Sequence, residues 1–163
     1  MGEGSDDITI MVIGEEPGKN EALQGRPFCG AAGKLLDQLL AHIGVPRESV
    51  YITNIVKDRP PENRDPLPQE IDLYGPFLDR QIDVIQPKVL ATLGRFSYGY
   101  IMKKFDAAMF LEPISQAHGK MFDAKARYGP IKIVPLYHPA AAIYNQKLKE
   151  TLFKDFEVLK QFV

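Results

Sequence analysis

Short apolar segments and amphipathic segments alternate along this chain, and this order limits the fold more than any other feature of the sequence. Apolar runs of strand length, bounded by turn residues, lie at 8–13, 50–56, 88–93 and 131–136. Apolar residues at helical spacing predict helices over 35–43, 69–85, 96–105 and 148–163. This order is typical of a parallel sheet covered by helices. Since 163 residues is the size of one domain, we predict a single α/β domain spanning 1–163.

Two stretches do not follow this alternation. Residues 57–68 are rich in proline and charge, so they predict an ordered surface loop, and its length for a connection suggests a functional role. Residues 106–130 carry no clear period, and 114–121 within them resemble a loop or an edge hairpin. Pro135 indicates that the last strand lies at a sheet edge or that the residue is near the strand's end.

Composition excludes several classes of protein. Lys and Arg number 20 against 21 Asp and Glu, so an anionic partner would have to be held by a local patch rather than by net charge. The single cysteine, Cys29, excludes an intramolecular disulfide and an all-cysteine metal site within one chain. No apolar run approaches the roughly 18 residues of a membrane span, and the N-terminus is too acidic for a signal peptide. We therefore expect a soluble cytoplasmic protein with no membrane partner.

Three loops follow strand ends, at 14–33, 54–68 and 137–145. The carboxyl ends of parallel strands meet at one edge of a sheet, where ligands bind, so these loops are expected to converge. They carry two carboxylates, an aromatic ring, a carboxamide and an imidazole: Glu15, Glu16, Phe28, Asn54 and His138. Such a set suits a planar ring that forms hydrogen bonds, and a nucleobase flipped out of a duplex is one such ring.

The motifs in these loops resemble those of the uracil-DNA glycosylase superfamily, most closely its thermostable type-4 branch. They are GEEPGKNEALQGRPFCGAAG, TNIVKDRPPENRDP, VLATLG and PLYHPAAAI, in that order. The resemblance implies a three-layer α/β/α sandwich with a central four-stranded parallel sheet. It also implies an intracellular prokaryotic repair enzyme, acting as a monomer, that flips uracil out of single- or double-stranded DNA. Hydrolysis of the N-glycosidic bond would leave an abasic site.

The resemblance also implies roles for individual residues. Gly14 and Phe28 would lie against the flipped uracil, with the Phe28 ring stacked on it, and Asn54 would read its O4 and N3 edge. His138 would donate to uracil O2 as negative charge builds there. Asn63, in the Pro-rich loop, matches an asparagine implicated in catalysis.

Two adjacent glutamates compete for the role of the catalytic carboxylate. Glu15 matches the carboxylate of the type-4 motif, whereas the next position is normally small in that branch and is Glu16 here. In a better-known branch of the superfamily that second position holds the aspartate that activates water. Glu15 and Glu16 therefore both stay candidates.

Contacts with DNA are expected from three places. The start of a helix near Gly30 and Gly33 offers free N–H groups to a phosphate. Basic side chains lie in the same loops, namely Arg26, Lys57, Arg59 and Arg64. The segment from Ala140 and Ala141 to Tyr144 would enter the duplex, with Ile143 or Tyr144 as the wedge.

The resemblance fails at the cofactor. Type-4 enzymes resemble one another in four cysteines that hold a [4Fe-4S] cluster, but no cysteine precedes the first strand here, and Asp58 and Tyr74 stand at the other two positions. We therefore predict no metal or cofactor. Pairing of Arg59 or Arg64 with Asp58 or Asp65, or packing of Tyr74, would then hold the Pro-rich loop. That loop also lacks the histidine of the branch that crosslinks uracil-DNA, so turnover is expected.

Other interpretations stay open. The chain could be a glycosylase for hypoxanthine, xanthine or a mismatched base, because Glu16 alters the pocket, or a non-catalytic module that binds uracil or single-stranded DNA. Taken singly, Phe28 is a common core residue, Asn54 a common turn residue and His138 a common loop residue. We expect His42 and His118 to be structural, and Cys29 to be a small buried residue.

Overall fold

A mixed sheet of six strands forms the centre of the molecule. The structure is a computed structural model that describes residues 2–3, 9–17, 19–57 and 65–163. The strand order is β1-β3-β2-β4-β6-β5. Four neighbouring strands are parallel: β3 (Tyr51–Asn54), β2 (Ile10–Gly14), β4 (Val89–Leu93) and β6 (Gly129–Leu136). The antiparallel edge strands are β1 (Gly2–Glu3) and β5 (Phe122–Ala126). The expected four parallel strands are thus confirmed, and two edge strands extend them.

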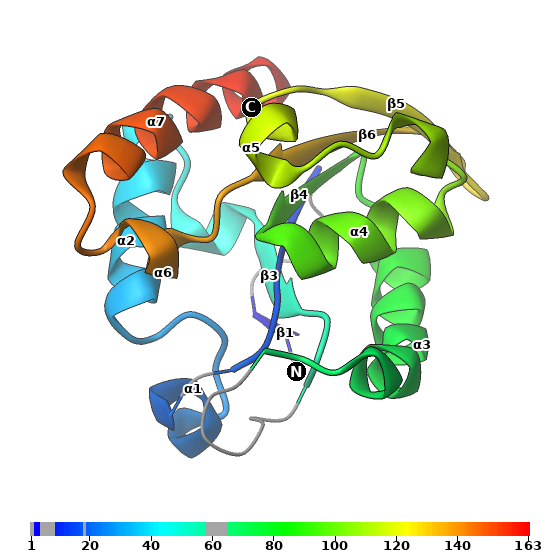
Figure 1. Ribbon diagram of the computed structural model, residues 1–163, viewed down its shortest axis with the longest axis horizontal. Coiled ribbons are helices and arrows are strands. Elements are labelled where there is room, and N and C mark those ends of the chain that lie inside the picture. Colours follow the sequence, from blue (N-terminus) through cyan, green and yellow to red (C-terminus); the bar gives the residue numbers. More distant parts are fainter. Residues whose placement is uncertain (1, 4–8, 18, 58–64) are drawn as a thin grey trace.

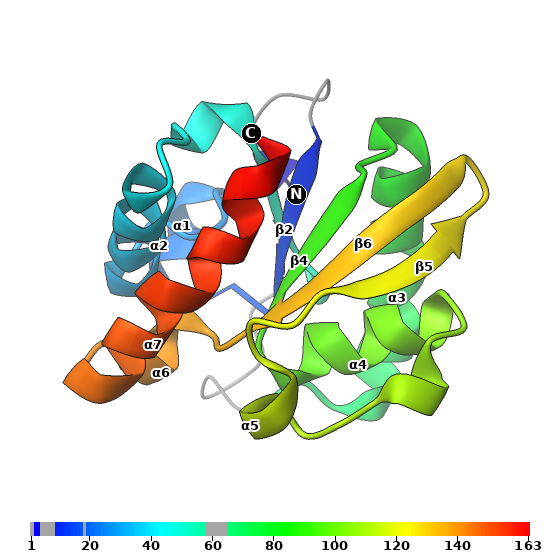
Figure 2. The ribbon, with the colours of Figure 1, turned by 90° about the horizontal axis from the view of Figure 1, so that it is seen from above.

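Helices cover both faces of this sheet (Figures 1 and 2). One layer contains α1 (Lys19–Gln24), α2 (Ala31–His42), α6 (Pro139–Ala142) and α7 (Gln146–Phe156). The other contains α3 (Pro68–Ile85), α4 (Arg95–Lys104) and α5 (Ile114–Ala117). Short 3-10 helices lie at Arg47–Ser49, Ala108–Phe110 and Glu157–Phe162. The expected α/β/α sandwich is confirmed, and no helix of the described residues has the length and apolarity needed to span a membrane.

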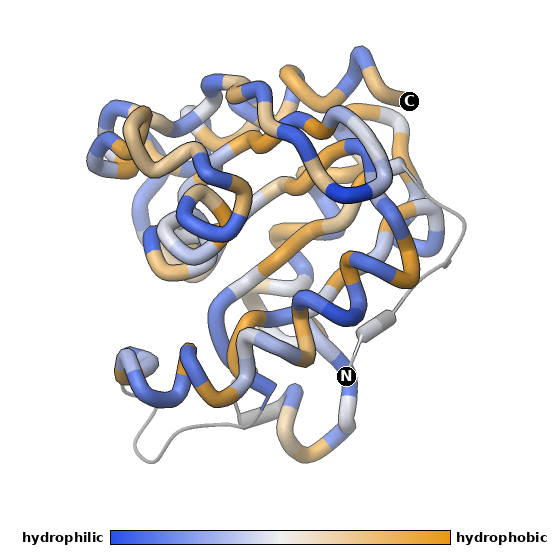
Figure 3. Tube along the Cα trace, turned by 90° about the vertical axis from the view of Figure 1, so that its right-hand side faces the viewer, coloured by the Kyte–Doolittle hydropathy of each residue, from blue (hydrophilic) through white to orange (hydrophobic). Residues whose placement is uncertain are grey.

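Alternate residues of the central strands face opposite helix layers. Ile10 and Val12 pack with Leu36 and Leu39 of α2, whereas Met11 and Ile13 belong to the core that contains α3 and α4. A parallel strand between two helix layers is apolar on both faces, which is why the sequence shows continuous apolar runs there. Figure 3 shows the helices instead as alternating hydrophilic and hydrophobic segments, because only one face of each is covered.

The region without a clear period, 106–130, contains a helix and the first strand of an edge hairpin. The expectation of a loop or edge hairpin at 114–121 was wrong in position, because a helix begins there and the hairpin follows it. Residues 114–117 form α5, and the hairpin consists of β5 and β6, paired from Phe122↔Ile133 to Ala126↔Gly129. Consequently β6 is not an edge strand. Pro135 lies near its end, opposite Thr92 of β4 and beyond the last residue paired with β5, so its missing N–H leaves no strand partner unsatisfied.

The three loops meet at one edge, as expected. Ile55 N donates to Gly14 O at 3.0 Å and Val56 N to Glu15 O at 2.8 Å, which ties the loop after β3 to the loop after β2. Gly94 N, directly after β4, donates to Leu136 O at the end of β6 at 2.9 Å. The carboxyl ends of all four parallel strands therefore form one continuous site.

Candidate active site

Gly14 ends β2 between the two residues predicted to contact a base. A Cβ atom built on Gly14 would lie 2.4 Å from Asn54 Oδ1 and 2.6 Å from the Phe28 ring. Both neighbours are buried, Asn54 with 3% and Phe28 with 5% of its surface exposed. Only glycine lets this backbone approach both side chains, so Gly14, Phe28 and Asn54 come together as the sequence predicted.

Phe28 adopts a backbone conformation that is rare for a residue with a side chain. Its φ is +51°, in the left-handed region. Its carbonyl points toward α2, where a Cβ on Gly33 would lie only 1.8 Å from Phe28 O. Gly33 therefore gives the Phe28 carbonyl room, a role that the sequence did not reveal.

His138 is held as a neutral donor. It caps the short helix α6, where its Nδ1 accepts from Ala140 N at 3.1 Å, so the ring proton resides on Nε2. Burial lowers the pKa of His138 to about 4. Its ring also stacks on Phe28, with centroids 5.5 Å apart and planes 27° apart. A neutral imidazole with a free Nε2–H matches the oxyanion donor that the resemblance implies.

Glu15 is fixed by the helix that follows β4. Its Oε2 accepts from Phe96 N at 2.9 Å in the first turn of α4, where free N–H groups favour a carboxylate. Burial raises the pKa of Glu15, and the Phe96 N–H opposes part of this effect. Gly94 makes the contact possible, because a Cβ there would lie 2.8 Å from the Glu15 carboxyl carbon.

A cavity of about 350 Å³ connects these groups. It is lined by Glu15, Glu16, Pro17, Glu21, Ala32, His138, Ala140 and Ala141. Both candidate carboxylates and the imidazole thus face one hollow, while Phe28 and Asn54 do not line it. The site places an anionic group and a neutral hydrogen-bond donor around the same space.

Of the predicted DNA-contacting residues, Ala140 and Ala141 line this cavity. Gly30 caps the 12-residue helix α2, Arg26 is exposed, and so are Ala140 and Ala141. The two candidate wedges differ, because Ile143 is half-buried whereas Tyr144 is 99% exposed. Asp58, Arg59, Asn63 and Arg64 lie outside the described residues, so their predicted roles stay predictions.

Lys57 is turned into the protein. Its Nζ donates to Thr53 Oγ1 at 2.9 Å, to Asn54 O at 2.5 Å and to Gln81 Oε1 at 2.6 Å. Burial lowers the pKa of Lys57 to about 8. The ammonium group is therefore engaged behind Asn54, and the phosphate contact that the sequence suggested for it stays a prediction.

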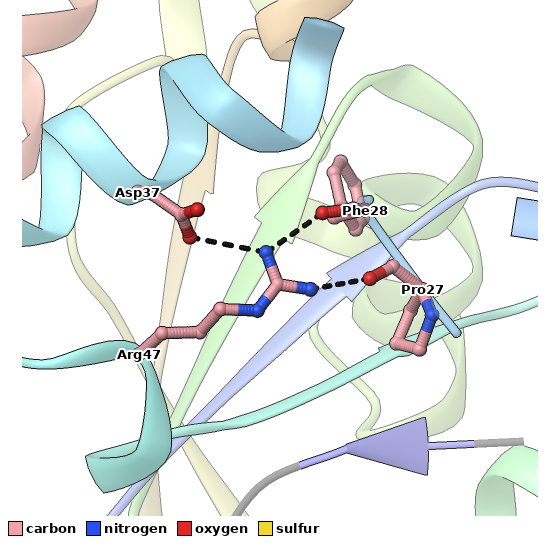
Figure 4. A network of polar contacts seen from close by, with 4 residues as sticks. All are labelled: Pro27, Phe28, Asp37 and Arg47. Atoms are coloured by element: carbon pink, nitrogen blue, oxygen red, sulfur yellow. Dashed lines mark hydrogen bonds and ion pairs between the residues drawn. The ribbon is translucent and has the colours of Figure 1, made fainter. Parts of the chain in front are cut away.

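Arg47 is a second cation at the site, and the sequence did not connect it with the site (Figure 4). Its Nη1 donates to Phe28 O at 2.7 Å and to Asp37 Oδ1 at 3.0 Å, and its Nη2 donates to Pro27 O. No motif signals this contact, since Arg47 lies in a 3-10 turn 19 residues after Phe28. Only the tertiary structure brings it behind the Phe28 backbone.

The remaining polar residues serve the framework. His42 lies 3.0 Å from Glu157, and His118 Nδ1 lies 2.7 Å from Asp155 Oδ2, in keeping with structural roles. Cys29 is half-buried rather than fully buried, with its Sγ 3.5 Å from Glu21 Oε2.

Of the two positions compared with cluster ligands, only Tyr74 lies within the described residues. Tyr74 is a half-buried aromatic that packs against the α3 and α4 core, and among the described residues no group of three or more His, Cys, Asp or Glu could hold a metal. Asp65 pairs with Arg95 at 3.1 Å, a partner that the sequence did not suggest.

Comparison with known proteins agrees with this architecture. The family model described as uracil DNA glycosylase superfamily matches residues 1–159. A type-4 uracil-DNA glycosylase of Sulfurisphaera tokodaii is 48% identical over 161 residues, which cover 98% of this chain and 72% of that protein. One of Archaeoglobus fulgidus is 44% identical, covering 96% and 77%. One of Thermotoga maritima is 38% identical, covering 100% and 82%. The chain belongs to the uracil DNA glycosylase superfamily.

Proposed function

We propose that this protein excises uracil from DNA by hydrolysing the N-glycosidic bond, which leaves an abasic site. The observation that carries the proposal is the meeting of Phe28, Asn54 and His138 at one strand edge beside a cavity with two carboxylates. An aromatic face, a carboxamide and a neutral imidazole complement uracil, while a carboxylate complements the sugar cation that forms as the bond breaks.

Base selection rests on Asn54. Its Oδ1 is buried and has no hydrogen-bond partner among the described residues. A buried acceptor without a partner costs about 1–3 kcal/mol, which a ligand N–H would recover. Uracil offers N3–H to Oδ1 and O4 to the amide N–H. Cytosine has an acceptor at N3 and a donor at N4 instead, so the carboxamide favours uracil.

His138 stabilises the leaving base. Cleavage leaves negative charge on uracil. The Nε2–H of a neutral imidazole donates a hydrogen bond to O2 and keeps its proton. A single donor of this kind contributes about 3 kcal/mol to transition-state stability. The lowered pKa of His138, about 4, keeps the ring neutral throughout the range in which the enzyme is expected to work.

The carboxylates act on the sugar side. Glu15 is oriented by the Phe96 N–H and stabilises the developing positive charge near C1′. Glu16 lines the same cavity and is a second group that can orient the attacking water. We expect Glu15→Gln to reduce the rate more than Glu16→Gln, since Glu15 is held in one orientation; the reverse order would assign the water to Glu16.

Binding of DNA involves the N–H groups at the start of α2, near Gly30, together with Arg26. Arg59, Arg64 and Asn63 of the Pro-rich loop are proposed to join them. Tyr144 is the proposed wedge, because its side chain is 99% exposed and free to enter the duplex. The protein is proposed to act as a monomer, inside the cell, on single- or double-stranded DNA.

No iron-sulfur cluster is part of this proposal. Two of the type-4 cluster positions hold Asp58 and Tyr74, and Tyr74 packs into the α3 side of the core. Iron and sulfide analysis of the purified protein tests this, and a stoichiometric amount of either would overturn it.

An oligonucleotide with one deoxyuridine, incubated with the protein and then treated with alkali, tests the activity. Matched strands carry hypoxanthine, xanthine or a G·T mismatch at the same place. We expect cleavage at uracil in single strands and duplexes. Cleavage only at another base would assign the pocket to that base, and retarded but uncut uracil-DNA would identify a binding module.

A further inference from the structure

Two half-buried cations lie directly behind the base-contacting residues, and each donates to at least one main-chain carbonyl. We propose that Arg47 and Lys57 are positioning residues, which fix the orientation of Phe28 and Asn54 by holding their backbones. The inference rests on the proposed uracil excision and extends it to residues that do not touch the base.

The Arg47 guanidinium holds two successive carbonyls. Nη1 donates to Phe28 O and Nη2 to Pro27 O, while Nη1 also contacts Asp37 on α2 (Figure 4). The Arg47 side chain is only 15% exposed. A planar fork with fixed donor directions matches two adjacent acceptors in a way that a lysine cannot.

The Phe28 backbone needs such a contact. A left-handed conformation costs a residue with a side chain about 1–2 kcal/mol, so the loop has a reason to relax to another conformation. Relaxation would turn the Phe28 carbonyl away from Gly33 and Arg47, and the ring would leave Gly14 and His138. Arg47 therefore stabilises the one backbone conformation that presents the ring to the base.

Lys57 holds Asn54 through a larger network. Its Nζ binds the Asn54 carbonyl, Thr53 Oγ1 and Gln81 Oε1, and Gln81 Nε2 donates to Tyr51 OH at 3.1 Å. The network joins the end of β3 to α3. Because Lys57 holds the carbonyl of Asn54, the ammonium group fixes the backbone from which the carboxamide reaches toward Gly14.

Positioning of this kind has a large effect on rate. Displacing a substrate-contacting group by about 1 Å can cost about 100-fold. Phe28 lies on a loop and Asn54 is the last residue of β3, and both kinds of position hold a side chain less firmly than the middle of a helix or strand does. The two cations supply the support that these positions lack.

A double-mutant cycle tests the Arg47 contact. Arg47→Met is introduced into the wild-type protein and into the Phe28→Leu variant. The single-turnover rate of uracil release is then measured with saturating enzyme. We expect a loss of about 10- to 100-fold with Phe28 present and less than about 2-fold with Phe28→Leu. Inhibition by free uracil should weaken in parallel, while affinity for DNA with a stable abasic-site analogue stays within about 2-fold.

Lys57→Met is measured in the same way with Asn54 and with Asn54→Ala. Arg127→Met is the matched control, since Arg127 is 79% exposed and pairs with Asp83 away from the site. Thermal unfolding shows whether each variant is folded at the assay temperature. If Arg47→Met is not folded, Asp37→Asn is measured in its place. This variant removes only the carboxylate that pairs with the guanidinium, so the expected loss of rate is smaller.

Equal losses in both backgrounds would overturn the inference, because they would mean a general effect on the fold. So would unchanged rates, or a loss confined to DNA affinity. A wild-type protein that releases no uracil would instead overturn the proposed function, so the two failures are distinguishable.

Discussion

Arg47 and Lys57 contact the backbone behind Phe28 and Asn54 in similar ways, but their charges are balanced differently. Arg47 has a carboxylate partner, Asp37, and a guanidinium that stays charged at any ordinary pH. The donors of Lys57 go to two neutral carbonyl oxygens and a hydroxyl, and burial lowers the pKa of Lys57 to about 8. Support for Phe28 should therefore be independent of pH, and support for Asn54 should depend on it.

The largest effects should come from the base-contacting residues themselves. We expect Asn54→Ala and His138→Ala each to reduce the single-turnover rate by about 100- to 1,000-fold, because each removes a hydrogen bond to the base. Circular dichroism should show both variants folded. Near-normal rates in either would mean that the base is held elsewhere, and the comparison between the two cations would lose its meaning.

Arg47→Met should cause the next largest loss, and its size should not change with pH. We expect the ratio of wild-type to variant rates to stay constant within about 2-fold from about pH 6 to pH 9, since guanidinium does not titrate there. The rate of Arg47→Lys should lie between those of the wild type and Arg47→Met, because an ammonium group cannot donate to both carbonyls in parallel. A ratio that varied steeply with pH would contradict the assignment.

Lys57→Met should cause a loss that shrinks as pH rises. Below about pH 8 the ammonium group of the wild type holds Asn54. Above that pH the amine has one donor fewer, so the wild-type rate should approach that of the variant.

The free energy of unfolding of the wild type should instead increase with pH. Because the folded pKa lies below the ordinary 10.5, the unfolded chain binds more protons between these values, so wild-type stability should rise with pH across that window. Parallel rate and melting curves of both proteins check this.

The smallest effect concerns acid stability. Since the pKa of His138 falls from 6.5 to about 4 on folding, the contribution of this residue is complete above about pH 6.5 and is lost as pH falls to 4. Chemical unfolding of the wild type and of His138→Gln at several pH values should show the wild type losing stability relative to the variant as pH falls from 6.5 to 4. A constant difference would mean that His138 is more accessible to water than its burial indicates.

Much of the fold could be predicted because its signals are local. The strand at 10–14 is apolar on both faces, and Leu35, Leu36, Leu39 and Leu40 repeat at helical spacing, so neither depends on distant residues. The strand β6 was predicted, but its partner β5 was not, because residues 122–126 alternate between exposed and covered positions with weak apolar character. Such a strand is specified by its partner more than by its own composition.

The sequence by itself determined the order of the four parallel strands and of the long helices, the three loops at one edge, and the identity of the side chains that meet there. Periodicity and motif spacing suffice for these features. The tertiary structure decided the left-handed conformation of Phe28, the neutral state of His138 and the inward direction of Lys57. It also brought Arg47 to carbonyls 19 and 20 residues away in sequence. Burial and long-range hydrogen bonds set these properties, and both exist only once the chain has folded.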